Sequence, residues 1–203
     1  EETDKRGRKT RTTQSRDSGR GTPQGSPISP LLANLYMRRF ILGWKKLGLE
    51  RRFGARIVTY ADDLVICCKS RADEALSAMR EIMERLGLTV NEEKTRTCRV
   101  PDESLDFLGY TFGRCYSTQT GRAYIGTRPS KKSVKRMIDS IRTHTDRKLC
   151  WLEATEVVER LNLGLVGWAN HFCLGPVSKA YKAIDAYTIT RLRSWLCDKH
   201  KVR

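Results

Sequence analysis

The sequence lacks the features that would place the chain in a membrane or outside the cell. It has no uncharged apolar run of about 18 residues, the length expected of a helix that spans a bilayer. Its first residues, EETDKRGRKT, contain neither the apolar stretch nor the cleavage site of a secretory signal peptide. These absences argue against membrane insertion and against secretion.

Cysteines are present, but not in a metal-binding pattern. The seven cysteines are odd in number and scattered, with no CxxC pair and no Cys/His cluster at zinc spacing. We therefore expect a reducing compartment, the cytoplasm of a bacterium or the interior of an organelle, and no structural zinc. The sequence also has no internal repeat and no low-complexity tract.

Acidic residues are outnumbered by basic ones. The 203 residues include 39 Lys and Arg against 23 Asp and Glu, a formal net charge of +16. Residues 114–203 alone hold 18 basic and 7 acidic side chains, a net of +11. Such a field attracts polyanions, and nucleic acid is the first candidate because binding of phosphates releases counterions. A solvated surface is the alternative, and charge does not distinguish RNA, DNA and anionic lipid.

The hydrophobic pattern predicts an α+β chain that becomes purely helical after Pro129. We expect a mixed domain over 1–114, a connecting hairpin over 115–129 and a helical domain over 130–203. Helices are predicted from a Ser29 cap to Gly48 and over about 16 residues after a Ser70 cap. The other predicted elements are hairpins within 1–22, 55–69 and 115–126, strands at 88–90, 95–100 and 105–113, and helices at 130–148, 154–172 and 177–199.

Two adjacent acids are the sharpest chemical feature. In ARIVTYADDLVICCK, Asp62 and Asp63 separate two apolar runs, where neither strand propensity nor packing favours acids. A hard divalent cation such as Mg²⁺ stabilises like charges at this spacing. At a tight turn they could bind metals that also contact nucleotide phosphates, as two-metal phosphoryl transfer requires. An ordinary Asp-rich hairpin turn is the alternative interpretation.

Five blocks of sequence together resemble one known family. They are GTPQGSPISPLLANLYM (21–37), YADDLVI (60–66), NEEKTRT (91–97), FLGYTF (107–112) and LNLGLVGWANHF (161–172). In this order and at these intervals they resemble the group II intron-encoded reverse transcriptases and maturases. The resemblance implies a partial polymerase palm, an antiparallel sheet with helices, over 1–114. It implies an all-α three-helix thumb, the maturase-specific domain, over 130–203.

The resemblance assigns residues to metal and nucleotide binding. Asp62 and Asp63 match the family's paired metal-site aspartates, which implies two Mg²⁺ ions, one of which Mn²⁺ could replace. Pro23, Gln24 and Gly25 match the turn that lies against the template and the incoming nucleotide. Glycine permits close backbone approach, and Gln can donate to a base or sugar. A plain loop before a helix is the alternative for this turn.

Further blocks match the parts of the family that hold the primer. Lys94 matches the lysine after the palm helix, whose ammonium could offset triphosphate charge, although a solvated lysine would fit the same sequence. Leu108 and Gly109 match the hairpin that grips the primer end, although FLGYTF would also suit a buried strand. Aromatic residues at helical spacing are more often core than base-stacking platforms, so we assign Trp168 and Trp195 to packing.

The predicted helix at 130–148 has a basic face opposite its apolar stripe. Such residues bind phosphates without reading sequence. The expected phosphate contacts are Lys131, Lys132, Lys135, Arg136, Arg142, Arg147 and Lys148.

Parts of the family pattern are missing. The third metal-binding carboxylate and the aromatic residue that excludes ribonucleotides lie upstream of the PQG turn in the family. Asp4 and Asp17 lie in polar, Arg-rich sequence and are not convincing substitutes. The fingers are absent as well, and no endonuclease cassette follows. We therefore expect the chain to be inactive alone and to need an N-terminal fingers and palm segment, on another chain or missing from this sequence.

The expected function is RNA-directed DNA polymerase activity, a nucleotidyltransferase reaction. Its partners would be an RNA template or intron RNA, a DNA or RNA primer and dNTP, with no membrane involved. One alternative is a non-catalytic maturase that binds intron RNA as a splicing cofactor. Another is a reverse transcriptase of a CRISPR-associated or other retroelement system, because fold likeness does not fix biological use.

Overall fold

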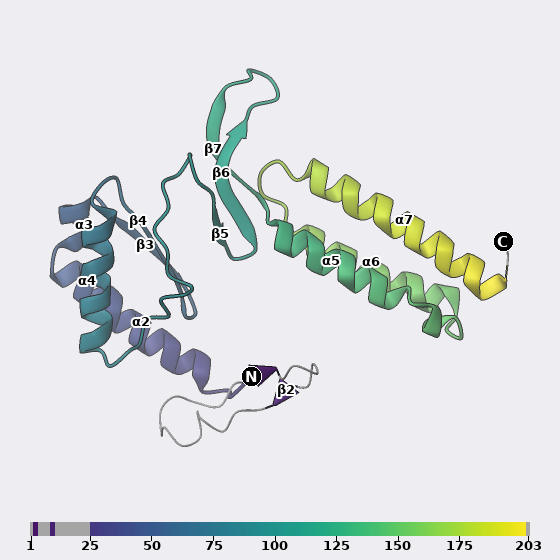
Figure 1. Cartoon of the computed structure of the whole chain (residues 1–203), viewed down its shortest axis with the longest axis horizontal. Coiled ribbons are helices and arrows are strands. Elements are labelled where there is room, and N and C mark those ends of the chain that lie inside the picture. Colours follow the sequence, from purple (N-terminus) through teal and green to yellow (C-terminus); the bar gives the residue numbers. More distant parts are fainter. Residues whose placement is uncertain (1, 4–8, 11–24, 202–203) are drawn as a thin grey trace. The chain divides into compact units, whose positions relative to one another are not determined.

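The structure, a computed structural model, describes residues 2–3, 9–10 and 25–201 (Figure 1). The chain divides into two compact units, Glu1–Thr97 and Cys98–Arg203. Each unit has its own hydrophobic core. Small antiparallel sheets followed by helices make up the fold, so the predicted α+β class is confirmed.

The first unit contains two small hairpins and three helices. Strands β1 (Glu2–Thr3) and β2 (Lys9–Thr10) pair antiparallel, as predicted for the first segment of the chain. The other elements are α2 (Ser29–Lys46), α3 (Leu49–Phe53), β3 (Arg56–Tyr60), β4 (Asp63–Cys67) and α4 (Ala72–Arg85). Strands β3 and β4 form the hairpin predicted within 55–69.

Large apolar side chains from helices form the core of the first unit. Helix α2 buries Phe40 and Trp44 completely, and both rings lie in an aromatic chain with Phe53 of α3. Helix α4 contributes a stripe of buried residues at helical spacing that includes Met79 and Met83. The β3–β4 hairpin packs one face against this core, and this packing positions the turn at its tip.

The second unit joins a three-stranded sheet to three helices. Its strands are β5 (Leu105–Phe107), β6 (Tyr110–Tyr116) and β7 (Ala123–Pro129), paired in that order and antiparallel. Helices α5 (Lys131–His144), α6 (Ala154–His171) and α7 (Ser178–His200) follow, with a short 3₁₀ turn, η1 (Arg147–Leu149), after α5. The three helices run side by side in Figure 1, and their core includes Trp195 at 1% exposure.

Several predicted boundaries in the first unit differ from the structure. Ser29 is the first helical residue of α2 rather than its cap, and Arg71 rather than Ser70 precedes α4. The strands predicted at 88–90 and 95–100 do not form. Instead, Asn91 organises a turn in which its side chain accepts a hydrogen bond from the Lys94 backbone N–H at 3.1 Å. Such side-chain to backbone bonds compete with strand formation.

In the second unit, two predictions of continuous structure were wrong. The strand predicted at 105–113 is broken at Leu108 and Gly109, which have positive φ angles and turn the chain back. The helix predicted at 130–148 ends at His144 because Thr145 is buried and its backbone carbonyl bonds to α7. Ser130 is the N-cap of α5 as predicted, and its Oγ accepts from the Ser133 N–H.

None of the helices in the described part of the chain is long and apolar enough to cross a membrane. All seven cysteines are unpaired.

Candidate metal-binding turn and nucleic-acid interface

The turn between β3 and β4 presents two aspartates at its tip. Strand pairing runs as far as Tyr60 opposite Asp63, so Ala61 and Asp62 form a two-residue turn. Ala61 has a φ of 51°, a left-handed conformation that costs an L-residue roughly 1–2 kcal/mol. Strain of this kind at a non-glycine residue is a feature of binding and catalytic sites.

The alternation of the hairpin fixes the orientation of this turn. Ile57, Leu64 and Ile66 lie on the face that packs against the core. Tyr60, which is 63% exposed, lies on the opposite face beside Asp63. The core therefore holds the base of the hairpin while its tip projects into solvent.

The chemistry of the aspartate pair fits Mg²⁺. Both side chains are exposed, and neither bonds to or pairs with another described residue. Mg²⁺ prefers carboxylate oxygens and is commonly bound through one or two carboxylates together with water and substrate phosphates. The described part of the chain has no cluster of three or more potential metal ligands. Among the described residues, Asp62 and Asp63 alone therefore do not form a complete set of metal ligands.

The structure describes only one residue of the PQG turn, Gly25. Pro23 and Gln24 lie outside the described residues. Gly25 lies before α2 with a φ of 84°, and a methyl group there would meet nothing within 4 Å. Its backbone conformation, rather than crowding, is what favours glycine at this position.

Lys94 lies in a hydrogen-bonded turn after α4. Its side chain is exposed and makes no contact with Asp62 or Asp63 that amounts to a hydrogen bond or ion pair. Glu92 anchors the same turn by accepting two hydrogen bonds from Arg80, at 3.0 and 2.5 Å. The Arg80 hydrogen bond lowers the pKa of the Glu92 carboxyl, and Glu92 in turn raises the pKa of Arg80.

A second two-residue turn, Leu108-Gly109, connects β5 and β6. Both residues have positive φ, 51° and 81°, the pattern of a type I′ hairpin. The Gly109 carbonyl accepts from the Ser130 N–H at 2.8 Å and from the Ser133 hydroxyl at 2.9 Å. A Cβ on Gly109 would lie 2.9 Å from the Ser133 Oγ and 3.0 Å from Phe172. The first turn of α5 therefore fixes this turn, and only glycine fits there.

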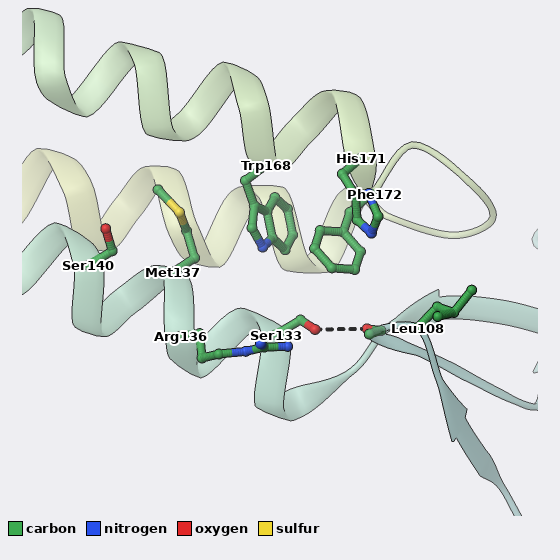
Figure 2. Close-up of a pocket in the computed structure, with 9 residues that line it drawn as sticks. Leu108, Ser133, Arg136, Met137, Ser140, Trp168, His171 and Phe172 are labelled. Atoms are coloured by element: carbon green, nitrogen blue, oxygen red, sulfur yellow. Dashed lines mark hydrogen bonds between the residues drawn. The ribbon is translucent and has the colours of Figure 1, made fainter. Parts of the chain in front are cut away.

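This turn forms one edge of a pocket of about 380 Å³. Figure 2 shows Trp168 and His171 of α6, and Phe172 directly after it, facing α5 across the pocket. The pocket brings the predicted primer-grip residues together with Arg136, one of the predicted phosphate contacts. Its lining residues are Leu108, Gly109, Ser133, Arg136, Met137, Ser140, Trp168, His171 and Phe172.

The tryptophans have the packing role that we predicted. Trp195 is buried in the second core, and Trp168 packs against that core while one part of it lines the pocket. The Trp168 ring lies 4.7 Å from that of Phe172 and edge-on to Tyr181 at 5.8 Å. Trp168 therefore combines a structural role with a partly exposed aromatic surface.

The predicted phosphate contacts all have exposed side chains. None of them forms an ion pair with another described residue, so each is available to an anion. Arg147 and Lys148 lie on η1 instead of on the helix where we expected them. Arg136 lies beside Met137 at the pocket. The members on α5 that point away from the buried Met137 and Ile141 are Lys131, Lys132, Lys135 and Arg142.

Two other basic residues stabilise the fold. Arg191 of α7 donates to the Thr145 carbonyl at 2.7 Å and to its hydroxyl at 3.1 Å, and it thereby caps the carboxyl end of α5. The Lys199 ammonium donates to the carbonyls of Cys150 and Leu152 at 3.1 and 2.7 Å. The sequence around Arg191 and Lys199 does not indicate these hydrogen bonds, because the partner residues lie more than 40 positions away.

Sequence reasoning also missed most of the pocket. Ser133 and Ser140 belong to no motif, and they meet His171 only because β5–β6, α5 and α6 converge. The sequence signals were two blocks: FLGYTF, which marks the turn at the edge of the pocket, and LNLGLVGWANHF, which contains Trp168, His171 and Phe172.

Comparison with protein families identifies the chain. The family model described as reverse transcriptase (RNA-dependent DNA polymerase) matches residues 6–112, more than half of the chain. The model described as group II intron, maturase-specific domain matches residues 134–203. A comparison with curated proteins gives no match. Reverse transcriptases as a family use divalent metals, and these two domains imply RNA and other nucleic-acid partners. The chain thus belongs to the reverse transcriptase family and is of the group II intron reverse transcriptase and maturase type.

Proposed function

We propose that the chain takes part in Mg²⁺-dependent, RNA-templated DNA synthesis as a reverse transcriptase of the group II intron type. The observation that carries this proposal is the pair of exposed, unpaired aspartates at the strained β3–β4 turn. When bound, Mg²⁺ would activate a primer 3′-hydroxyl and stabilise the leaving pyrophosphate. The residues of the chain bind and orient the reactants around that chemistry.

In the first unit, Asp62 and Asp63 hold the metal ions. The packed face of β3–β4 holds the base of the hairpin, and the exposed tip presents the carboxylates. Gly25, with Pro23 and Gln24, contacts the template and the incoming nucleotide. The exposed Lys94 ammonium offsets triphosphate charge.

In the second unit, the Leu108-Gly109 turn grips the primer end. Its anchoring by Ser130 and Ser133 fits this role because a gripping element has to keep its position while the strand moves. The exposed basic face of α5, which includes Lys132 and Lys135, binds phosphates of the primer–template duplex or of intron RNA. We further propose that residues 1–114 act as the palm and 130–203 as the thumb, joined by 115–129.

The remaining metal ligand would come from an N-terminal fingers and palm segment. Within the described residues, β3 and β4 pair with no third strand. A two-stranded ribbon is marginally stable by itself, and its open edges can accept another strand. We propose that a strand carrying the third carboxylate adds to this ribbon, and that the chain is inactive without it.

Primer extension by the chain joined to such a segment tests the proposal. Asp62→Asn and Asp63→Asn should each lower the rate about a thousandfold, because a bound metal supplies several kcal/mol of transition-state stabilisation. Glu84→Gln is the matched control, since Glu84 is an exposed, unpaired acid of the same unit. Equal extension by the aspartate variants and the control would refute the assignment.

The exposed basic face and the match to the maturase-specific domain favour a second role in intron RNA binding. In that role, the aspartate pair would be dispensable for splicing. Charge reversal at Lys132 and Lys135 would instead abolish splicing. A splicing assay with both sets of variants separates the two roles, which are compatible with each other.

A further inference from the structure

We propose that the pocket between the β5–β6 turn, α5 and the end of α6 holds one unpaired nucleotide of a bound strand. The base would lie against the aromatic wall, and its phosphate would bind Arg136. This inference rests on the proposed function, because it assumes that the second unit binds nucleic acid.

The size and lining of the pocket suit a planar aromatic group. Its volume of about 380 Å³ lies within the range of small-ligand sites, roughly 300–1,000 Å³. Apolar walls with a few polar groups are typical of such sites. Leu108 and Met137 supply aliphatic surface, while Ser140 and His171 supply groups that can bond to a base or sugar.

The charge around the pocket selects an anion. Arg136 lines it, is exposed, and forms no ion pair with a described residue. Lys132 and Lys135 are exposed nearby on the same helix, and no carboxylate is among the lining residues. A guanidinium binds phosphate through two parallel hydrogen bonds. An aromatic group joined to a phosphate is a nucleotide.

The aromatic wall explains why the base should be unpaired. Trp168, His171 and Phe172 lie next to one another along the end of α6 and face the pocket (Figure 2). Bases that are splayed out of a helix stack on such side chains, whereas paired bases stay inside the duplex. Stacking on aromatic side chains does not require a particular base, because every base has a π-face.

Hydrogen bonds preform the pocket. The Ser133 hydroxyl and the Ser130 N–H both hold the Gly109 carbonyl, which ties the turn to α5. The Tyr110 hydroxyl donates to the His171 carbonyl at 2.5 Å, which ties β6 to the end of α6. A ligand therefore meets walls that are already in place and pays little ordering cost.

The test compares hairpin RNAs that carry one bulged nucleotide, with either 2-aminopurine or an abasic sugar at the bulge. Fluorescence anisotropy with the full chain should show about tenfold tighter binding of the 2-aminopurine RNA. Arg136→Ala should bring this ratio close to one. Ser140→Leu should do the same by filling the pocket without changing charge. Arg142→Ala, on the same helix but outside the pocket, should weaken both RNAs equally and keep the ratio.

The deoxyribose versions of both probes show which strand supplies the nucleotide. If only the RNA probes show tighter binding with the base than without it, the pocket binds a nucleotide of RNA. If the DNA probes show the same affinity ratio, a nucleotide of either strand can occupy it. If the unaltered chain binds the 2-aminopurine and abasic RNAs equally and its affinity still depends on salt, the nucleotide pocket is refuted. The proposed function then stands. A chain that binds neither probe even at low salt overturns the proposed function itself. Circular dichroism of each variant confirms that it is folded.

Discussion

The β3–β4 and β5–β6 hairpins both close with two residues, Ala61-Asp62 in the first and Leu108-Gly109 in the second. At the first turn, Asp62 and the adjacent Asp63 are exposed acids that have no partner among the described residues. In the second, the backbone carbonyl of Gly109 is bonded twice to the start of α5, and a basic helix face lies nearby. The second turn is completed by the fold itself, whereas we propose that the first is completed by a bound metal.

The packing around the turns carries the same contrast. Gly109 has the residue type that its φ of 81° demands, and the surrounding atoms leave no room for a Cβ. Ala61 and Leu108, the first residues of the two turns, have the same φ of 51° without being glycine, so this angle does not separate the turns. The comparison therefore teaches that packing fixes the second turn, whereas the first hairpin exposes its carboxylates.

Substitutions at the two turns should change stability in opposite directions, and this is the largest of the expected effects. Gly109→Ala should lower the free energy of unfolding by about 2 kcal/mol, because it adds φ strain and a clash with Ser133 and Phe172. Ala61→Gly should raise it by roughly 0.5 kcal/mol by removing strain. Urea titration followed by tryptophan fluorescence measures both. The comparison fails if Ala61→Gly costs as much as Gly109→Ala.

A smaller effect should come from the far end of α5, the helix whose start holds the second turn. Arg191→Ala should lower the free energy of unfolding by about 1.5 kcal/mol, because two polar atoms of the buried Thr145 lose a charged donor. Arg193→Ala is the matched control, since Arg193 is an exposed, unpaired arginine on the same helix. It should shift stability by less than about 0.5 kcal/mol. Equal losses from both variants would mean that α7 does not support α5 through this arginine.

The smallest effect concerns the ion pair beside Lys94 in the first unit. Because Arg80 lowers the pKa of Glu92 below its ordinary value of 4.5, the pair stabilises the fold above that pH. The contribution disappears as the pH falls through the lowered pKa. Glu92→Gln should therefore lower the Tm at pH 7 by less than about 2 °C, since the pair is exposed. The difference should shrink in acid.

Glu93→Gln is the control for this measurement, because Glu93 is a neighbouring exposed acid without an ion pair. A calorimetric Tm difference for Glu92→Gln that grows as the pH falls would have the wrong sign for the assigned pKa shift.

The first turn was predictable from sequence, because its signals are local. Two runs of β-branched residues flank Ala61-Asp62-Asp63, and both the hairpin and its exposed acids are present in the structure. The cap at Ser130 followed from equally local chemistry. What these acids do chemically stays a prediction, because it depends on groups that the described residues do not supply.

The second turn was harder to predict because its causes are distant in sequence. Residues 105–113 have the composition of one strand. They form a hairpin instead, which turns where Gly109 lies against Ser133 and Phe172. The end of α5 depends on Arg191, nearly 50 residues away. The chain divides into compact units after Thr97, whereas composition suggested a boundary within 115–129. The division into a palm over 1–114 and a thumb over 130–203 stays a prediction.

The most direct measurement is a Mn²⁺ titration of the ¹⁵N-labelled full chain followed by NMR. If Asp62 and Asp63 hold a divalent metal, the amide signals from Tyr60 to Leu64 should broaden first, and the double variant Asp62→Asn with Asp63→Asn should lose that effect. Broadening that begins at other carboxylates, while the signals of this turn stay sharp, would contradict the account.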